Sequence, residues 1–253
     1  MSITLEPART NYSTPSMDAL KVSALEGGRP TPRPSRVIKF HTVQKKNKQA
    51  VASLMCKTIK ESFDAEMLSL IEPYHSVRLT AAIRNSFVDN YALSIEDAKT
   101  DVEQFDFNSS CTFDKTVKTK FFVKGGSHNG YAILHVPAFV PVSELDVPDE
   151  ATNFKISCKL ISISNFKFSK ELNSYVPENM DAHGQFGTFE TTMLPVLRMQ
   201  TQPITAQVCI NKCKPIEQGV HTLLVAAVKF YSCEHGKFVH LSEKGSMKIM
   251  KLF

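Results

Sequence analysis

Four side chains in the C-terminal half of the chain are suited to binding a metal ion. Cys209 and Cys213 are separated by three residues, and Cys233 lies two positions before His235. Zinc prefers four thiolate or imidazole ligands, but the cysteine pairs of zinc knuckles usually enclose two residues. In an extended strand, Cys209 and Cys213 would lie about 13 Å apart, too far for one tetrahedral ion unless the residues between them form a turn. We therefore predict that the protein holds no zinc and needs no cofactor.

The serines and histidines form no local catalytic motif. No HExxH, GxSxG or glycine-rich phosphate-binding sequence is present. A nucleophile paired with a distant histidine leaves no such signature, so an enzyme remains an alternative. The preferred interpretation is a protein that is not an enzyme. Its eight histidines are then expected in structural or surface positions: His41, His75, His128, His135, His183, His221, His235 and His240.

The positive charge of the chain lies near its N-terminus. Residues 1–50 contain nine Lys or Arg and three Asp or Glu, a net charge of +6, whereas the remaining residues contain 21 basic and 22 acidic residues, a net charge of −1. A cationic segment of this kind can contact phosphates or an acidic protein surface. The candidate contact residues for nucleic acid or for a neighbouring subunit are Arg29, Arg33, Arg36, Lys45, Lys46 and Lys48.

Residues 1–36 are expected to form an extended basic arm. Five prolines and the pair Gly27-Gly28 exclude a long regular element, because proline fixes its own φ and restricts the residue before it. The sequence GGRPTPRPSR is typical of polyproline-like chain. The same composition is typical of a disordered tail. A solvated arm is therefore the alternative to an arm that lies on another subunit.

Residues 37–100 carry the hydrophobic periodicity of helices. A proline ends the first helix, Ser76 is expected to cap a second one, and the sequence after Ser94 resembles a capping box. We expect these helices to pack their apolar stripes into a core. The residues predicted to be buried are Val51, Leu54, Met55, Ile59, Phe63, Met67, Leu70, Ile71, Val77, Leu79, Ile83 and Phe87.

From Val102 onward the period changes to two, which predicts strands. The segment His221–Tyr231, HTLLVAAVKFY, contains an unbroken apolar block that is typical of a strand covered on both faces, with a buried helix as the alternative. A turn at Glu234–Lys237 should join it to a partner strand, and 247–253 should be a final strand. The other expected strands are 102–107, 117–124, 131–136, 154–163, 189–199 and 206–210.

This pattern predicts a mainly β (α+β) fold, an antiparallel β-sandwich at 101–253 with an N-terminal helical segment and an extended arm. Roughly eight or nine short strands with short connections are typical of a sandwich. Gly125–Gly130 is expected to be a hairpin loop, and Asn173–Gly187 a long polar loop. The six scattered cysteines are expected to be free thiols.

The sequence also indicates where in the cell the protein is expected. No window approaches the ~20 apolar residues of a membrane span. The first residues lack the basic and then apolar form of a secretory signal. We therefore expect a cytoplasmic protein, or one carried in a particle that is released by cell lysis, with no membrane partner.

Three stretches of the β-rich segment resemble a family of uncharacterised proteins from Bacteroidota. The chain has QFDFN at Gln104–Asn108, ATNFKI at Ala151–Ile156 and LLVAAVKFYSCEHGKFVHL at Leu223–Leu241. In that family the corresponding stretches resemble GFEFN, ATHF and LLLGIEFYQ followed by NGK. This chain departs from the family in its longer basic arm and in GSMKI at Gly245–Ile249. The resemblance implies a β-rich fold and supplies no catalytic residues.

Arm, helices and sandwich together favour a structural protein that assembles with copies of itself. The expected form is a component of a phage or virus-like particle, or the subunit of a filament or tube. The alternative is a nucleic-acid-binding protein that uses the basic arm.

Overall fold

The computed structural model describes residues 40–88, 92–125, 130–242 and 244–253. These residues belong to the unit Ile38–Phe253, and the predicted arm, 1–36, lies outside the described residues. The helices are α1 (Phe40–Glu61), α2 (Ala65–Leu68), α3 (His75–Ser86), α4 (Lys99–Val102), α5 (Phe113–Thr116) and α6 (Pro141–Glu144), with 3₁₀ turns η1 (Ile95–Ala98) and η2 (Asn211–Cys213). The strands are β1 (Ala92–Leu93), β2 (Phe122–Gly125), β3 (Tyr131–Val136), β4 (Asn153–Ser164), β5 (Phe166–Ser169), β6 (Ser174–Pro177), β7 (Phe186–Glu190), β8 (Leu194–Pro195), β9 (Ile204–Cys209), β10 (Val220–Glu234), β11 (Lys237–His240) and β12 (Ser246–Leu252).

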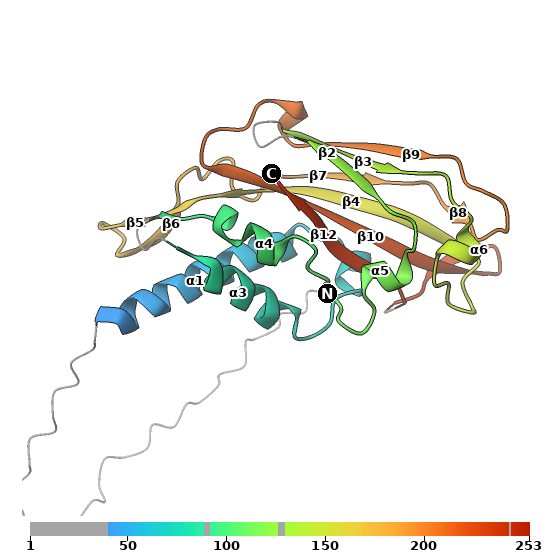
Figure 1. Ribbon diagram of the computed structural model, residues 1–253, viewed down its shortest axis with the longest axis horizontal. Helices are drawn as coiled ribbons and strands as arrows, with labels where there is room; N and C mark the ends of the chain where they lie inside the picture. Colours follow the sequence, from blue (N-terminus) through green and yellow to red (C-terminus); the bar gives the residue numbers. More distant parts are fainter. Residues whose placement is uncertain (1–39, 89–91, 126–129, 243) are drawn as a thin grey trace, which may run out of the picture. The chain divides into compact units, whose positions relative to one another are not determined.

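Strand β10 lies in the middle of the largest sheet (Figure 1). One of its edges pairs with β4 along twelve consecutive residues, Val220–Tyr231. Its other edge pairs with β12 near the start and with β11 near the end. The order β11-β10-β4-β7 describes this sheet, with β12 also beside β10 and β8 beside β4, and every pairing is antiparallel. The prediction of a central strand is confirmed, and so is the turn that leads into its partner.

The side chains of β10 alternate between two hydrophobic cores. Leu223 and Val225 belong to a core shared with the helices, whereas Leu224 and Ala226 belong to a core shared with β3 and β9. Because successive residues of a strand point to opposite faces, a strand with two covered faces favours apolar residues at consecutive positions, and any polar residue in it needs a buried partner. This double burial explains the unbroken apolar run in the sequence.

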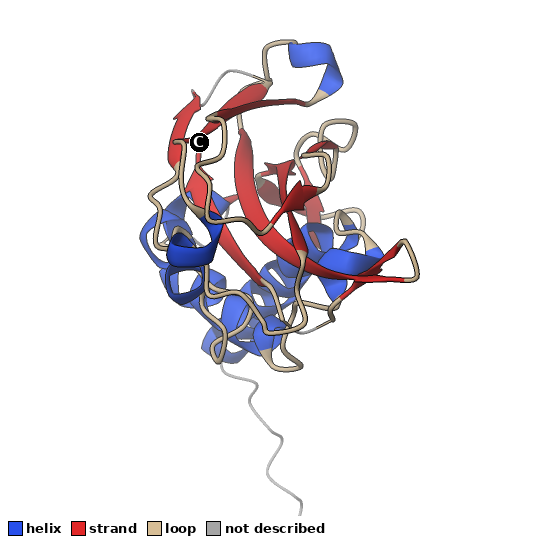
Figure 2. Cartoon of the chain, turned by 90° about the vertical axis from the view of Figure 1, so that its right-hand side faces the viewer, coloured by secondary structure: helices blue, strands red, loops and turns tan. Residues whose placement is uncertain are grey.

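Helices and strands form three layers. The sheet β2-β3-β9 packs on one face of the large sheet, so the predicted antiparallel sandwich is correct. The helices α1, α3 and α4 cover the other face, and Figure 2 shows them gathered along one side of the strands. One core joins helical residues with residues of β4, β10 and β12, so the segments 37–100 and 101–253 pack as parts of the same unit. Within the described residues, no helix has the length and hydropathy that crossing a bilayer requires.

The helical segment differs from its prediction at four points. The first stripe does not form one helix, because Asp64 caps a new helix by accepting a hydrogen bond of 2.9 Å from the amide of Met67. Helix α3 begins at His75 rather than after Ser76. Leu54, at the flank of the stripe, and Val77 were expected in the core but are 43% and 68% exposed.

The strand predictions also need corrections. The segment 102–107 is not a strand: α4 ends at Val102, and the segment keeps only one isolated bridge, at Asp106. Phe105 and Phe107 imitate a strand pattern because both are buried, and their ring centroids lie 5.4 Å apart. The predicted polar loop 173–187 contains β6. The expected strand 189–199 is replaced by β7 and β8, and 117–124 becomes a strand only from Phe122.

The exposures of two neighbouring residues in α1 lead to opposite expectations for the same substitution. Met55 is fully buried, so Met55→Asp should lower the free energy of unfolding by about 3 kcal/mol or more, because it places an unpaired charge in a core. Leu54→Asp should change it by about 0.5 kcal/mol or less, because that side chain faces solvent. Urea unfolding of the two variants and the wild type measures both changes. Equal destabilisation by the two substitutions would show that the helix is rotated from the orientation described.

Candidate functional site

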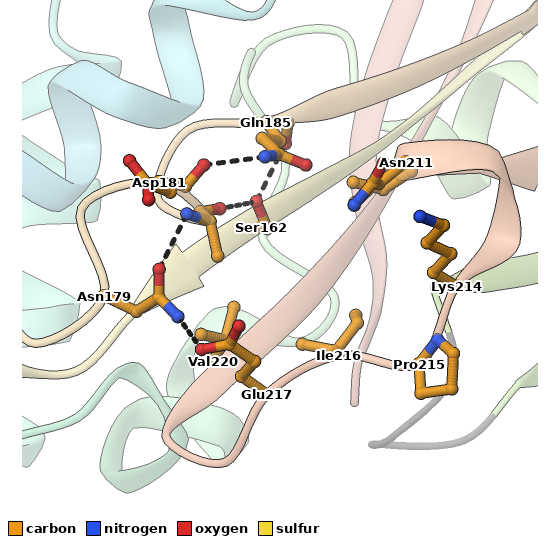
Figure 3. Close-up of a pocket in the computed structure, with 12 residues that line it drawn as sticks. Ser162, Asn179, Asp181, Gln185, Asn211, Lys214, Pro215, Ile216, Glu217 and Val220 are labelled. Atoms are coloured by element: carbon orange, nitrogen blue, oxygen red, sulfur yellow. Dashed lines mark hydrogen bonds between the residues drawn. The ribbon is translucent and has the colours of Figure 1, made fainter.

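Two polar hollows lie at the end of the sheet where β4 finishes and β10 begins. The first, shown in Figure 3, has a volume of about 130 Å³. One wall is the loop between β6 and β7, and the other is the segment 210–217 between β9 and β10. Residues from three separate parts of the chain therefore meet in a space of the size that holds a few waters or a small polar molecule.

Hydrogen bonds to β4 fix the first wall. The amide of Ser162 donates to the Gln185 carbonyl oxygen over 2.8 Å, and the Ser162 hydroxyl donates to the carbonyl oxygens of Ala182 and Gln185. Asn179 Oδ1 accepts from the Ala182 amide at 2.9 Å, and Gln185 Nε2 donates to the Asp181 carbonyl at 2.6 Å. This loop holds its shape because its own carbonyl groups are satisfied by a buried strand.

A disulfide between Cys209 and Cys213 closes the second wall. From the sequence, this pair was expected to be distant unless the residues between them form a turn; η2 is such a turn and brings their Cα atoms to 4.8 Å. The expectation of free thiols is therefore wrong for this pair, while the structure has free thiols at Cys56, Cys111, Cys158 and Cys233.

The four candidate zinc ligands do not come together at one point, because Cys233 and His235 lie far from the Cys209–Cys213 pair. Val220, next to the disulfide segment, begins β10, and Cys233 lies near its far end. Fourteen strand steps separate Val220 from Glu234, a distance of about 45 Å. Among the residues the structure describes, no group of three or more His, Cys, Asp or Glu side chains is arranged to hold a metal ion.

The second hollow is larger and acidic. Its volume is about 590 Å³, and it shares Glu217 with the first hollow. Glu96 and Glu178 add two further carboxylates to its lining, and Asn165 contributes a buried carbonyl oxygen without a hydrogen-bond donor among the described residues. A cleft lined by charges of one sign concentrates ions of the opposite sign, so this hollow favours cationic groups.

His221 lies between this hollow and the helical layer. Burial lowers the pKa of its imidazole more than the nearby Glu96 carboxylate raises it. Its Nε2 atom lies 3.2 Å from the Ser94 hydroxyl and 3.8 Å from a carboxylate oxygen of Glu96. The histidine therefore joins η1 to β10 as a neutral hydrogen-bonding group at pH 7.

The polar groups of the first hollow are arranged for hydrogen bonding. The Ser162 hydroxyl donates to carbonyl oxygens, and no described histidine or lysine contacts it as a base. His183, in the loop that forms the first wall, accepts a hydrogen bond from the Ser164 amide and forms a hydrogen bond with the Thr58 hydroxyl. The lining combines amide and carboxylate side chains and the Lys214 ammonium group with the apolar side chains of Ile210, Ile216 and Val220.

A second cluster of charges lies on the helical face of the sheet, around Lys229. This side chain is 1% exposed, and its Nζ lies 2.9 Å from Glu66 Oε2 and 2.5 Å from Glu190 Oε1. Tyr231 donates its hydroxyl hydrogen to the same Glu66 oxygen over 2.8 Å, and Asp64 lies 3.8 Å from the lysine. The cluster ties α2 to β10 and β7.

The charges of this cluster stabilise one another. Burial alone would raise the pKa of Glu190, but hydrogen bonds from Lys155, Lys229 and Ser157 outweigh it and lower that pKa to about 2. Burial likewise opposes the charge on Lys229, and its bonds to Glu190 and Glu66 raise its pKa above the ordinary value. Removing one partner leaves an uncompensated charge in a low-dielectric setting, so these ions act as a unit.

The sequence contained one signal for this cluster that was not used. Lys229 interrupts an apolar strand, and a lysine inside a doubly covered strand requires a buried partner. Its partners could not be assigned because Glu66 lies 163 residues away. The residues of the two hollows gave no signal, since amide and carboxylate side chains are common in any loop.

The six cationic residues chosen from the sequence fall in different settings. Arg29, Arg33 and Arg36 lie outside the described residues. Lys45 and Lys46 lie within α1. The side chain of Lys48 donates a hydrogen bond of 2.8 Å to the carbonyl oxygen of Phe87, and so helps to hold the connection after α3.

Comparisons with known proteins do not assign the chain to a family. No protein-family model matches the chain, and no curated protein matches it as a relative. The resemblance to the Bacteroidota family therefore stays a prediction from the sequence.

The ion cluster around Lys229 makes the stability of the fold depend on pH. The folded-state pKa of Glu190, about 2, lies below its ordinary value of 4.5, so the charged carboxylate stabilises the fold above pH 4.5. This contribution should be lost as the pH falls from 4.5 towards 2. Urea unfolding of wild type and Glu190→Gln across this range should give a smaller pH slope and a lower stability at pH 7 for the variant. The exposed Glu171→Gln variant is the control, and equal slopes for Glu190→Gln and wild type would contradict the assignment.

Proposed function

We propose that this chain is a non-enzymatic structural protein that assembles with copies of itself through its N-terminal arm. The observation that carries the proposal is a cationic, proline-rich arm that precedes a folded unit with an acidic hollow. Residues 1–36 contain five basic and three acidic residues, a net charge of +2, and residues 37–253 contain 25 basic and 22 acidic residues, a net charge of +3. Because these net charges have the same sign, attraction between the arm of one subunit and the body of the next requires a local acidic surface on the body.

The folded unit supports this proposal in a second way. It begins at Ile38, and its two cores are built from residues between Val51 and Phe253. A unit that contains its own cores leaves a preceding segment available for binding elsewhere. Prolines in that segment reduce the entropy lost on docking, because their φ angles are already restricted.

The acidic hollow gives the unit a surface of suitable charge. Glu96, Glu178 and Glu217 line it together, and Glu178 is exposed. Arginine is the cation that makes the most hydrogen bonds to carboxylates, since its guanidinium carries five donors. The proposed product is a symmetric particle, a filament or a tube, held in the cytoplasm or released by lysis.

Removal of the arm tests the proposal. We expect wild type to sediment as a large assembly and the variant lacking residues 1–36 to sediment as a monomer or small oligomer with an unchanged circular dichroism spectrum. A full-length variant with Arg29, Arg33 and Arg36 replaced by glutamine separates the effect of charge from that of length, and it should assemble more weakly. Identical sedimentation of wild type and the truncated protein would rule out the arm as the connector.

Nucleic-acid binding is the second candidate, favoured by three lysines near the start of α1 that follow the three arginines of the arm. Phosphate contacts weaken steeply as salt concentration rises, because each contact releases condensed counterions. If this function is correct, single-stranded or duplex DNA should bind at low salt, and the triple arginine variant should lower the slope of log K against log salt by about 2 to 3. A titration by fluorescence anisotropy measures the slope. Absence of binding at 50 mM salt would remove this candidate.

A further inference from the structure

The disulfide between Cys209 and Cys213 is more accessible to solvent than the two buried cysteines of the chain. Both residues are partly exposed, whereas Cys56 and Cys158 are buried. Burial raises the pKa of the Cys158 thiol to about 12 and also raises that of Cys56, which keeps both protonated and unreactive. A small reductant in solution therefore reaches the disulfide without disturbing the core.

The chain between the two cysteines takes a conformation that L residues avoid. Asn211, Lys212 and Cys213 have φ angles of 47°, 56° and 60°, so three consecutive residues are left-handed and none is glycine. Left-handed residues normally occur singly, because Cβ approaches the following carbonyl oxygen. A run of three requires restraint from outside the turn.

Few hydrogen bonds supply that restraint. The Cys213 amide donates to the Ile210 carbonyl over 2.9 Å, and the Lys214 amide donates to the Asn211 carbonyl over 3.3 Å. One bond of 2.7 Å joins the Ile210 amide to the Gly130 carbonyl oxygen. The covalent link spans the left-handed turn itself, which is otherwise supported by this anchor, by the two local bonds and by close packing of the Cys213 and Lys214 backbone against Gly130.

The same segment forms one wall of the first hollow. Ile210, Asn211, Lys214, Pro215, Ile216 and Glu217 line it from this side (Figure 3). The opposite wall is bonded to the buried strand β4 through Ser162, and a bond from Asn179 Nδ2 to Glu217 crosses between the walls. One wall is thus held by the sheet, and the other is held by the disulfide, by the bond between Ile210 and Gly130 and by the bond to Glu217.

We propose that Cys209–Cys213 is a reversible redox site, reduced by dithiols, that controls the shape of this hollow. Oxidised, the disulfide holds the left-handed turn and keeps the hollow formed. Reduced, the turn relaxes to right-handed or extended angles, and the wall 210–217 moves away from the loop between β6 and β7. Disulfides in a reducing compartment are usually of this transient, sensing kind.

The reaction is an ordinary thiol–disulfide exchange. A thiolate of the dithiol attacks one cysteine sulfur, the disulfide bond breaks, and the other cysteine leaves as a thiolate that takes a proton from water. The second thiol of the reagent then displaces the first cysteine and closes the reagent's own disulfide. Two electrons pass from the dithiol to the cysteine pair.

Hydrogen exchange on the full chain tests the proposal, with dithiothreitol as the dithiol. We expect reduction to accelerate exchange of the amides in 211–217 by about tenfold or more, because local opening becomes easier. Exchange of the amides in 223–228 of β10 should not change. The Cys209→Ser/Cys213→Ser variant should exchange fast with or without the reagent, and Cys233→Ser, which removes an exposed free thiol, should behave like wild type.

Thiol counting under denaturing conditions completes the test. The oxidised protein should give four thiols and the reduced protein six. Six thiols in protein purified without reductant would overturn the proposal. So would unchanged exchange in 211–217 after reduction, or faster exchange in β10 as well, since the first shows a disulfide that does not shape the wall and the second a general loss of structure.

Discussion

The twelve consecutive backbone pairs between β4 and β10 are the interaction on which the described unit depends. They place both strands in the interior of the sheet, where each face must be covered and each side chain is assigned to a face by its position. A shift of one residue would move Lys229 into the sandwich core and Leu224 to the helical side. The register of this one pairing therefore decides where the helices, the second sheet and the buried ions are found.

The helical face of the sheet has two parts with different chemistry. Leu223 and Val225 lie under α1 and α3 in an apolar part, and further along β10 the same face becomes polar at Lys229 and Tyr231. Hydrophobic contact is tolerant of small shifts, whereas a buried lysine requires its carboxylates at fixed positions. The apolar part provides most of the attraction between the layers, and the polar part specifies how they are aligned.

The sequence predicted those features that depend on local periodicity. It identified β10, β4 and β3 because an apolar block or strict alternation is visible within ten residues. It failed at 102–107, where two buried phenylalanines alternate in a segment that hydrogen-bonds to β12 without forming a strand, and at Leu54, where the edge of a helical stripe cannot be located without its partner. The residues of the ion cluster and of the disulfide turn were harder to predict than the strands. Glu66 and Lys229 are in contact although 163 residues separate them in the sequence. The turn after Cys209 has left-handed backbone angles at Asn211, Lys212 and Cys213, and these residue types do not predict them.

The order of the elements has a consequence for synthesis. The apolar side of α1 shares one core with α3 and with residues of β4, β10 and β12, and these three strands all follow the helices α1 to α4 in the chain. At typical translation rates, the 163 residues between Glu66 and Lys229 take roughly ten to thirty seconds to appear. Until β10 and β12 are made, this core lacks their side chains, and the apolar side of the helices stays partly open to chaperones and to the same stripe on a second nascent chain. The core beneath the helices is therefore completed late, when the last strands of the chain are made.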